Sequence, residues 1–196
     1  MGPLAAGVDN MTMWAALQFH YEIPPTSPEG VKLINYLTNY SPALAVFFAN
    51  PYPSRRLTRA WWGWGNMRRQ PNYWWFRDGE ELREFWLSLP RLIKEIKDGV
   101  WMVDLSRPDF PDLFHEITIH WFVRPRWCLG TIEFRPLDSL PPNRIGEAAE
   151  FFLKVVDKIL TTSELPKISP QDWWNMIFKQ NRFQAEKLLR ELLGNH

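Results

Sequence analysis

The sequence predicts an α+β domain in which an antiparallel or mixed sheet is covered by helices on one face. Two observations predict this class. Three short segments alternate apolar and polar residues with a period of two, which is typical of half-buried strands. Longer segments between and after them repeat apolar residues at helical spacing. Because no linker or internal repeat divides the 196 residues, we expect a single domain over residues 1–196.

The first predicted strand covers residues 12–23. Its polar residues Gln18, His20 and Glu22 alternate with apolar ones, and Pro24-Pro25 ends the pattern. The residues at the N-terminus, 1–10, are small and irregular, and we expect them to be flexible.

Two helix starts follow this strand, each a serine N-cap with a proline at the first helical position. They are Ser27-Pro28 and Ser41-Pro42. The sequence therefore predicts two consecutive helices, of which the second covers residues 43–49.

Residues 50–77 show no clear period and are expected to form a long loop. Asp78 then begins a strong amphipathic helix whose apolar stripe extends to Ile96. Pro90 interrupts this stripe, so we expect it to kink or split the helix.

The second half of the chain predicts two more strands and two helical regions. The strands cover residues 116–123 and 129–137, and the five residues between them are short enough for a hairpin loop. An amphipathic helix follows over residues 145–160, and Ser169-Pro170 starts a last helical region that ends near Leu193.

The composition narrows the class of protein. The net charge is +1, so no overall field draws the chain to nucleic acid or to a membrane. The single cysteine, Cys128, excludes an internal disulfide and a cysteine-based zinc site. No apolar run approaches the ~20 residues of a membrane span, so a soluble, cytoplasmic protein is expected. The 12 Trp and 13 Phe indicate either a ring-rich core or an apolar partner surface.

Each predicted strand has one polar face, and pairing of the strands would join these faces into one surface. That surface would hold Gln18, His20, Glu22, Glu116, Thr118, His120, Thr131, Glu133 and Arg135. Carboxylates from neighbouring strands suit Mg²⁺, which prefers oxygen ligands and bridges phosphates. An arginine beside them suits a carboxylate or phosphate, which it holds through two parallel hydrogen bonds. The alternative is an ordinary wet sheet face with cross-strand charge pairs.

Three segments resemble the glutamate–cysteine ligase family and occur in the order of that family. The first combines QFHYE at 18–22 with NYLTNYSPALAVFFAN at 35–50, followed by a proline. The second, TIHWFVRPRWCLGTIEFRPLDSLP at 118–141, is similar to the family's T…RP…GT.E.R..D..P pattern. The third, NRFQA at 181–185, is similar to its NRWRA run. The resemblance implies the C-terminal part of the glutamine synthetase-like ligase fold.

The resemblance also implies ATP-dependent formation of an amide bond between a glutamate-like amino acid and an amine. Such enzymes activate the carboxylate to an acyl phosphate, with Mg²⁺ neutralising the phosphates. By carry-over, the metal ligands are Glu133 and Glu22, the cofactor-binding residues are Gln18, His20 and Arg135, and the catalytic residues are Arg135 and Arg59.

Two departures from the family's pattern limit the implied activity. The N-terminal half of the family, with its further metal ligands, is missing, and Gln18 stands where the family can have histidine. We therefore expect catalysis only with a complementary N-terminal half. A sheet cut midway has an unpaired edge, so we expect a homo- or hetero-oligomer through that edge. The alternative is a non-catalytic oligomeric subunit or scaffold derived from the same fold.

Residues 55–77 interleave six arginines with five tryptophans, without an acidic residue before Asp78. Such a loop can bind single-stranded nucleic acid through phosphate attraction and base stacking. It equally suits a lid over ATP phosphates or a cap packed by cation–π contacts. We rank the lid or interface first and nucleic acid as the lesser alternative, because the near-neutral chain lacks a wider basic face.

Overall fold

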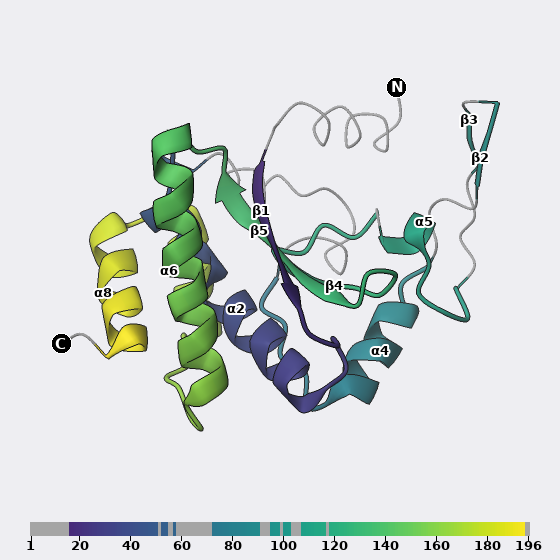
Figure 1. Cartoon of the computed structure of the whole chain (residues 1–196), viewed down its shortest axis with the longest axis horizontal. Coiled ribbons are helices and arrows are strands. Elements are labelled where there is room, and N and C mark those ends of the chain that lie inside the picture. Colours follow the sequence, from purple (N-terminus) through teal and green to yellow (C-terminus); the bar gives the residue numbers. More distant parts are fainter. Residues whose placement is uncertain are drawn as a thin grey trace.

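A small antiparallel sheet with helices packed on one face forms the centre of the computed structural model, which confirms the α+β class (Figure 1). The structure describes residues 16–50, 52–54, 57, 72–90, 95–98, 100–102, 107–116 and 118–194. The expected flexible segment 1–10 lies outside these residues. The elements are β1 (Ala16–Glu22), α2 (Pro28–Phe47), α4 (Gly79–Leu87), β2 (Glu95–Lys97), β3 (Val100–Met102), α5 (Leu113–Glu116), β4 (Val123–Arg126), β5 (Thr131–Asp138), α6 (Pro142–Thr161), α7 (Pro170–Lys179) and α8 (Arg182–Leu193).

The sheet has the order β1-β5-β4, with both neighbours antiparallel to the central strand β5. Phe19 of β1 and Val123 of β4 both lie opposite Phe134, whereas His20 lies opposite Glu133. The alternation predicted for β1 is confirmed, since its polar side chains are exposed and its apolar ones are half-buried. Strands β2 and β3 form a separate hairpin that the sequence patterns did not predict.

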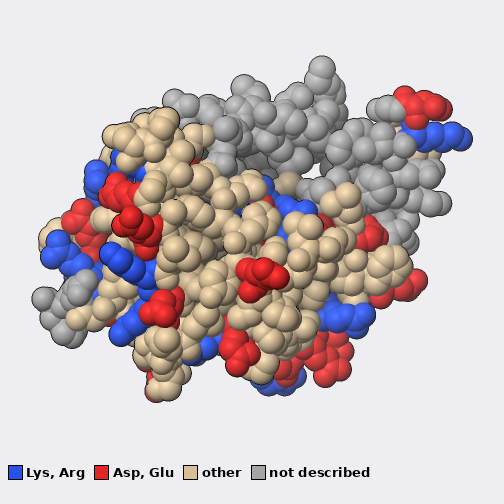
Figure 2. All heavy atoms as spheres, viewed as in Figure 1, with Lys and Arg blue, Asp and Glu red and all other residues tan. Residues whose placement is uncertain are grey.

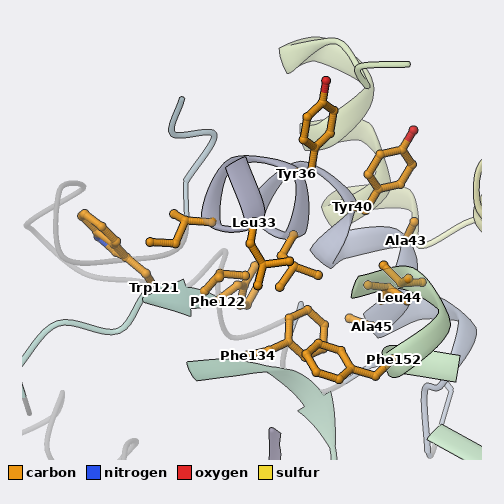
Figure 3. Packing of buried hydrophobic residues seen from close by; sticks show 14 of the residues in the cluster. Leu33, Tyr36, Tyr40, Ala43, Leu44, Ala45, Trp121, Phe122, Phe134 and Phe152 are labelled. Atoms are coloured by element: carbon orange, nitrogen blue, oxygen red, sulfur yellow. The ribbon is translucent and has the colours of Figure 1, made fainter. Parts of the chain in front are cut away.

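Helices α2 and α6 cover the apolar face of this sheet. The Phe152 ring of α6 stacks on Phe19 with centroids 4.8 Å apart and lies 5.0 Å from Phe134. Figure 3 shows Phe134 and Phe152 against each other, while Tyr36 and Tyr40 of α2 point away from the sheet with their hydroxyl groups outermost. In Figure 1 the helices α6 and α8 lie on one side of the strands, and α5 lies on the other.

Helix α2 runs unbroken through Pro42, so the prediction of two helices is wrong. The predicted N-cap at Ser27 is confirmed, because its side chain accepts a hydrogen bond from the Gly30 amide. Pro42 has no N–H to donate to the Thr38 carbonyl, which a proline inside a helix normally leaves unsatisfied. Here that carbonyl accepts from the Ser41 hydroxyl at 2.8 Å and from the Trp173 indole N–H at 2.9 Å. A distant side chain therefore replaces the missing helical bond.

Two asparagines on the buried α2 helix each bind the backbone of a distant extended segment, and we call these pairs the amide clamps. Asn35 donates Nδ2 to the Phe76 carbonyl at 2.7 Å and accepts from the Phe76 amide at 2.9 Å. Asn39 makes the same two bonds with Ile168, at 2.9 and 2.8 Å. Each clamp satisfies a donor and an acceptor that would otherwise be buried without partners.

The strand predicted over residues 116–123 is wrong. Its start belongs to the helical turn α5, which is capped by Asp112: the carboxylate accepts from the His115 amide, and the carbonyl accepts from the Glu116 amide. Strand β4 begins only at Val123 and occupies most of the stretch predicted as the loop. The predicted hairpin itself is confirmed, but its turn covers residues 127–130, with Gly130 at a positive φ of 64°. Pro125 is tolerated in β4 because, among the described strands, β4 lies at the edge of the sheet.

The remaining helices lie where the sequence predicts them, and only α4 ends much earlier than expected. Helix α4 begins after the Asp78 cap but stops at Leu87, ahead of Pro90, and Ile96 lies in β2 instead. Ser169 caps α7 as predicted, and Gln180 in a left-handed conformation separates α7 from α8. No helix in the described part of the chain is both long enough and apolar enough to cross a bilayer.

Candidate functional site

The face of the sheet opposite α2 and α6 brings polar residues from all three strands together, and we call it the polar face. In the middle strand β5, Glu133 lies between His20 of β1 and Arg124 of β4. Two residues before Glu133 in β5, on the same face, Thr131 lies between Glu22 and Arg126. The imidazole Nδ1 of His20 lies 3.2 Å from the Thr131 hydroxyl, which fixes the ring on this face.

Five charged side chains gather at the β4 side of the polar face, and we call them the charge cluster. They are Glu116, Arg124, Arg126, Glu133 and Arg135. Glu133 Oε2 accepts from Arg124 Nε at 2.6 Å and from Arg126 Nη1 at 3.2 Å. Arg126 Nε also donates to Glu116 Oε2 at 2.9 Å. Arg135 Nε lies 3.9 Å from the other Glu133 oxygen, Oε1. With three arginines and two glutamates, the cluster has a net charge of 3 − 2 = +1.

The segment that follows α5 folds back over this part of the sheet and buries it. Arg124 Nη1 donates to the backbone carbonyls of Glu116, at 2.7 Å, and of Ile119. The Glu116 carboxylate accepts from the Cys128 amide at 3.0 Å as well as from Arg126. Consequently the polar face is covered beside β4 and exposed along β1.

Burial and pairing act in opposite directions on Glu133. Burial alone would raise the pKa of its carboxyl group, because the charged form loses its hydration. The nearby positive charges of Arg124 and Arg135 and the hydrogen bond from Arg124 outweigh this effect and hold the pKa below its ordinary value. Glu133 is therefore ionised at neutral pH, although its side chain is only 1% exposed.

The structure brings five of the six residues predicted from the resemblance onto the polar face. Gln18, His20 and Glu22 are exposed on β1. Glu133 is buried in the charge cluster, and Arg135 is half-buried beside it. Arg59 lies outside the described residues.

Sequence reasoning missed the parts of Glu116, Arg124 and Arg126 in the charge cluster. Glu116 was expected on a strand, whereas the other two fell in the expected hairpin loop. The signal was available in the alternation, because Arg124 and Arg126 continue a period of two that a loop does not require. Thr118 and His120, expected on the same strand as Glu116, lie outside β4.

The described residues do not fit a Mg²⁺ site. Within them, no group of three or more His, Cys, Asp or Glu side chains could hold a metal ion. Glu133 already binds two guanidinium groups. Glu22 does not lie opposite Glu133 but opposite Thr131, two residues away in β5. Mg²⁺ requires an octahedral set of oxygen ligands, and this part of the chain does not present one.

The arginine–tryptophan loop lies largely outside the described residues, so its nucleic-acid and lid alternatives stay predictions. Of its tryptophans, Trp74 packs against Phe85 and Trp121. The Trp75 ring meets Tyr36 edge-on, and the Lys167 ammonium lies 3.9 Å above it. Both of these rings are thus bound within the protein. Figure 2 shows basic and acidic side chains interspersed over the visible face, without one large patch of a single sign.

Comparison of the chain with models of protein families, with curated proteins and with solved structures finds no match.

Proposed function

We propose that this chain is a component of an ATP-dependent carboxylate–amine ligase that forms a γ-glutamyl-type amide bond through an acyl phosphate. The observation that carries the proposal is the strand register, in which His20 lies directly opposite Glu133 on the polar face. Gln18 and Glu22 flank His20 on the same face, and Arg135 lies beside Glu133. These are the residues that the resemblance to the glutamate–cysteine ligase family singles out.

The proposed role of the chain is to bind and orient the reacting groups. Arg135 would hold the oxygens of a phosphate or of the substrate carboxylate, because a guanidinium group binds both through two parallel hydrogen bonds. Gln18 and His20, exposed beside it, would contact the nucleotide. ATP and Mg²⁺ stay part of the proposal, and Mg²⁺ would supply neutralisation of the phosphate charge. Glu22 would supply one carboxylate ligand, and the others would have to come from a complementary N-terminal half, because Glu133 is engaged by arginines.

Turnover by the reconstituted protein tests the proposal. The chain is combined with a complementary half, L-glutamate, an amine and ATP, and release of ADP and phosphate is measured. We expect Arg135→Ala to lower turnover by ~10²-fold or more, as loss of a fixed cation at a developing charge does. Glu22→Gln is expected to lower it as well. Arg190→Ala, on the exposed surface of α8, serves as the control. Unchanged turnover in both site variants would refute the proposal.

The second candidate function is a non-catalytic oligomeric subunit or scaffold. Two observations favour it. Glu133 is neutralised by Arg124 and Arg126 instead of lying open to a ligand. Among the described strands, β1 pairs only with β5, and its apolar side chains are half-buried at this edge of the sheet. This candidate predicts a stable oligomer in analytical ultracentrifugation and no heat of binding for Mg²⁺–ATP in calorimetry.

A further inference from the structure

The charge cluster on the polar face has a net positive charge, whereas a metal site is expected to have a net negative one. A metal site concentrates carboxylates, whereas here three guanidinium groups surround two carboxylates. A divalent cation entering this cluster would meet a net positive charge. A negatively charged group would meet fixed hydrogen-bond donors.

We infer that Arg126 takes the place expected of a divalent cation, and that Arg126 and Arg135 bind an oxyanion, a carboxylate or a phosphate group, without a metal. This inference deepens the proposed function, because it concerns the same polar face and names what this chain binds there by itself.

Arg126 is held by two carboxylates, one at each of two nitrogens. Its Nε donates to Glu116 at 2.9 Å, and its Nη1 donates to Glu133 at 3.2 Å. Within the described residues no hydrogen bond engages its remaining nitrogen, Nη2, and the side chain is 16% exposed. Two carboxylates therefore fix the guanidinium plane and leave Nη2 for a ligand. A donor fixed in advance loses less conformational entropy when it binds.

Arg135 provides the second cation at the same carboxylate. Its Nε lies 3.9 Å from Glu133 Oε1, whereas Arg126 bonds to Oε2, so the two guanidinium groups flank the two oxygens of Glu133. The Arg135 side chain is 15% exposed. An oxyanion that contacts both guanidinium groups beside the Glu133 carboxylate would receive charge-assisted hydrogen bonds, which are about twice as strong as neutral ones.

Arg124 does not contact the ligand; it is a positioning residue that acts through Glu133. Its side chain is only 6% exposed, and its nitrogens donate to Glu133 and to two backbone carbonyls. It offers a ligand little access. What it does is neutralise Glu133, so that this carboxylate does not repel an incoming anion.

The ligand would reach the cluster from the β1 side, where the polar face is exposed. His20 stands there, fixed through Nδ1 by Thr131 at 3.2 Å. Glu22, also exposed, is the opposing negative charge on this side. Water screens an exposed carboxylate far more than it screens the partly buried arginines, so the attraction of the cluster prevails.

Calorimetry on the full chain alone tests the inference. The probes are inorganic phosphate and L-glutamate, each titrated in EDTA and again with Mg²⁺, so that the two arms distinguish a phosphate site from a carboxylate site. We expect binding of at least one probe, with a Kd that changes less than about twofold between EDTA and Mg²⁺ and that weakens with salt. Binding that requires Mg²⁺, or binding of neither probe, would overturn the inference.

Substitutions at the two arginines localise the site. Arg135→Gln and Arg126→Lys are each expected to weaken binding by about tenfold, since each removes a charge-assisted hydrogen bond. Arg126→Lys keeps the positive charge that Glu116 and Glu133 require, and thermal unfolding confirms that the variant is folded. The matched control is Arg190→Gln on the exposed surface of α8. Wild-type affinity in both folded site variants would also overturn the inference.

The two proposals can fail separately. Metal-independent binding of an oxyanion together with absent ligase turnover would remove the proposed function and leave this inference standing. Turnover with strictly Mg²⁺-dependent binding would do the reverse.

Discussion

The amide clamps of α2 and the charge cluster of the polar face are both buried polar systems, yet they differ in what they contribute. The clamps are neutral. Each asparagine donates one hydrogen bond to a buried backbone carbonyl and accepts one from a buried backbone amide. Folding alone explains them, because buried backbone groups without partners are costly. The cluster instead buries formal charges, which lose several kcal/mol of hydration each.

That cost is not required by the sheet. Well-packed apolar residues often replace a buried ion pair without loss of stability. The polar face could therefore hold β4 against β5 with apolar side chains at positions 124 and 133. The difference teaches that the clamps belong to the fold, whereas the cluster lies where we propose that this chain binds a charged ligand.

The largest expected effect comes from breaking the charge cluster on one side only. Glu133→Gln leaves Arg124 buried without its carboxylate, so we expect a loss of about 3–5 kcal/mol in the free energy of unfolding. Urea denaturation followed by circular dichroism measures this loss.

The control removes both charges together. Arg124→Met combined with Glu133→Leu should destabilise the protein less than Glu133→Gln does, because neither of these two charges is left unpaired and Arg126 keeps Glu116 as a partner. A double variant as unstable as Glu133→Gln would contradict the view that the sheet does not need these charges.

The pH dependence of the stability of the wild-type protein provides a second test of the contribution of Glu133. The folded-state pKa of Glu133 lies below its ordinary value of 4.5, so its contribution to stability is present above that value and is lost as the pH falls further. The double variant should therefore lose less stability on acidification than the wild type.

An intermediate effect is expected from removing an amide clamp. Asn35→Leu leaves the Phe76 amide and carbonyl buried without partners, which should cost about 2–4 kcal/mol in urea denaturation. Asn39→Leu should behave similarly at Ile168. A loss below about 1 kcal/mol would show that water replaces the clamp.

Asn35→Asp introduces an ionisable carboxyl group, like those of the charge cluster, into an amide clamp. A protonated carboxyl group can still donate to the Phe76 carbonyl and accept from its amide, but an ionised one can only accept. Burial raises the pKa of such a group, so stability should be greatest at low pH and should fall as the pH rises through this raised value. This trend is opposite to that of Glu133. A variant that is equally stable at acid and neutral pH would contradict the buried setting of Asn35.

Local patterns in the sequence predicted the elements whose causes are local. The alternation in β1 and the caps Ser27 and Ser169 needed only neighbouring residues, and the structure confirms them. Helix α2 could not be predicted as one unit, because the donor that satisfies the carbonyl ahead of Pro42 comes from Trp173, 135 residues away from Thr38. Tertiary context of this kind overrides a local stop signal.

The candidate site also has one part that local patterns predict and one part that depends on tertiary structure. Placing the polar residues of β1 on one face with Glu133 required only the period of a strand, and the register bears it out. The partners of Glu133 depended on how residues 113–116 and 118–122 lie over the sheet, which follows from the cap at Asp112 and from the late start of β4. Without that fold-back, Glu133 appeared open to a metal.

The smallest effect is expected from ion pairs that water surrounds. On α8, Lys187 lies 3.9 Å from Glu191, with side chains 67% and 43% exposed. Lys187→Ala should change the free energy of unfolding by no more than about 0.5 kcal/mol, because solvent screens the pair and alanine favours the helix. Arg182 and Glu186, 3.8 Å apart on the same helix, provide a second test of the same kind. A loss above about 1 kcal/mol at either pair would mean that charge stabilises this protein even in water. The large effect at Glu133 could then no longer be attributed to burial.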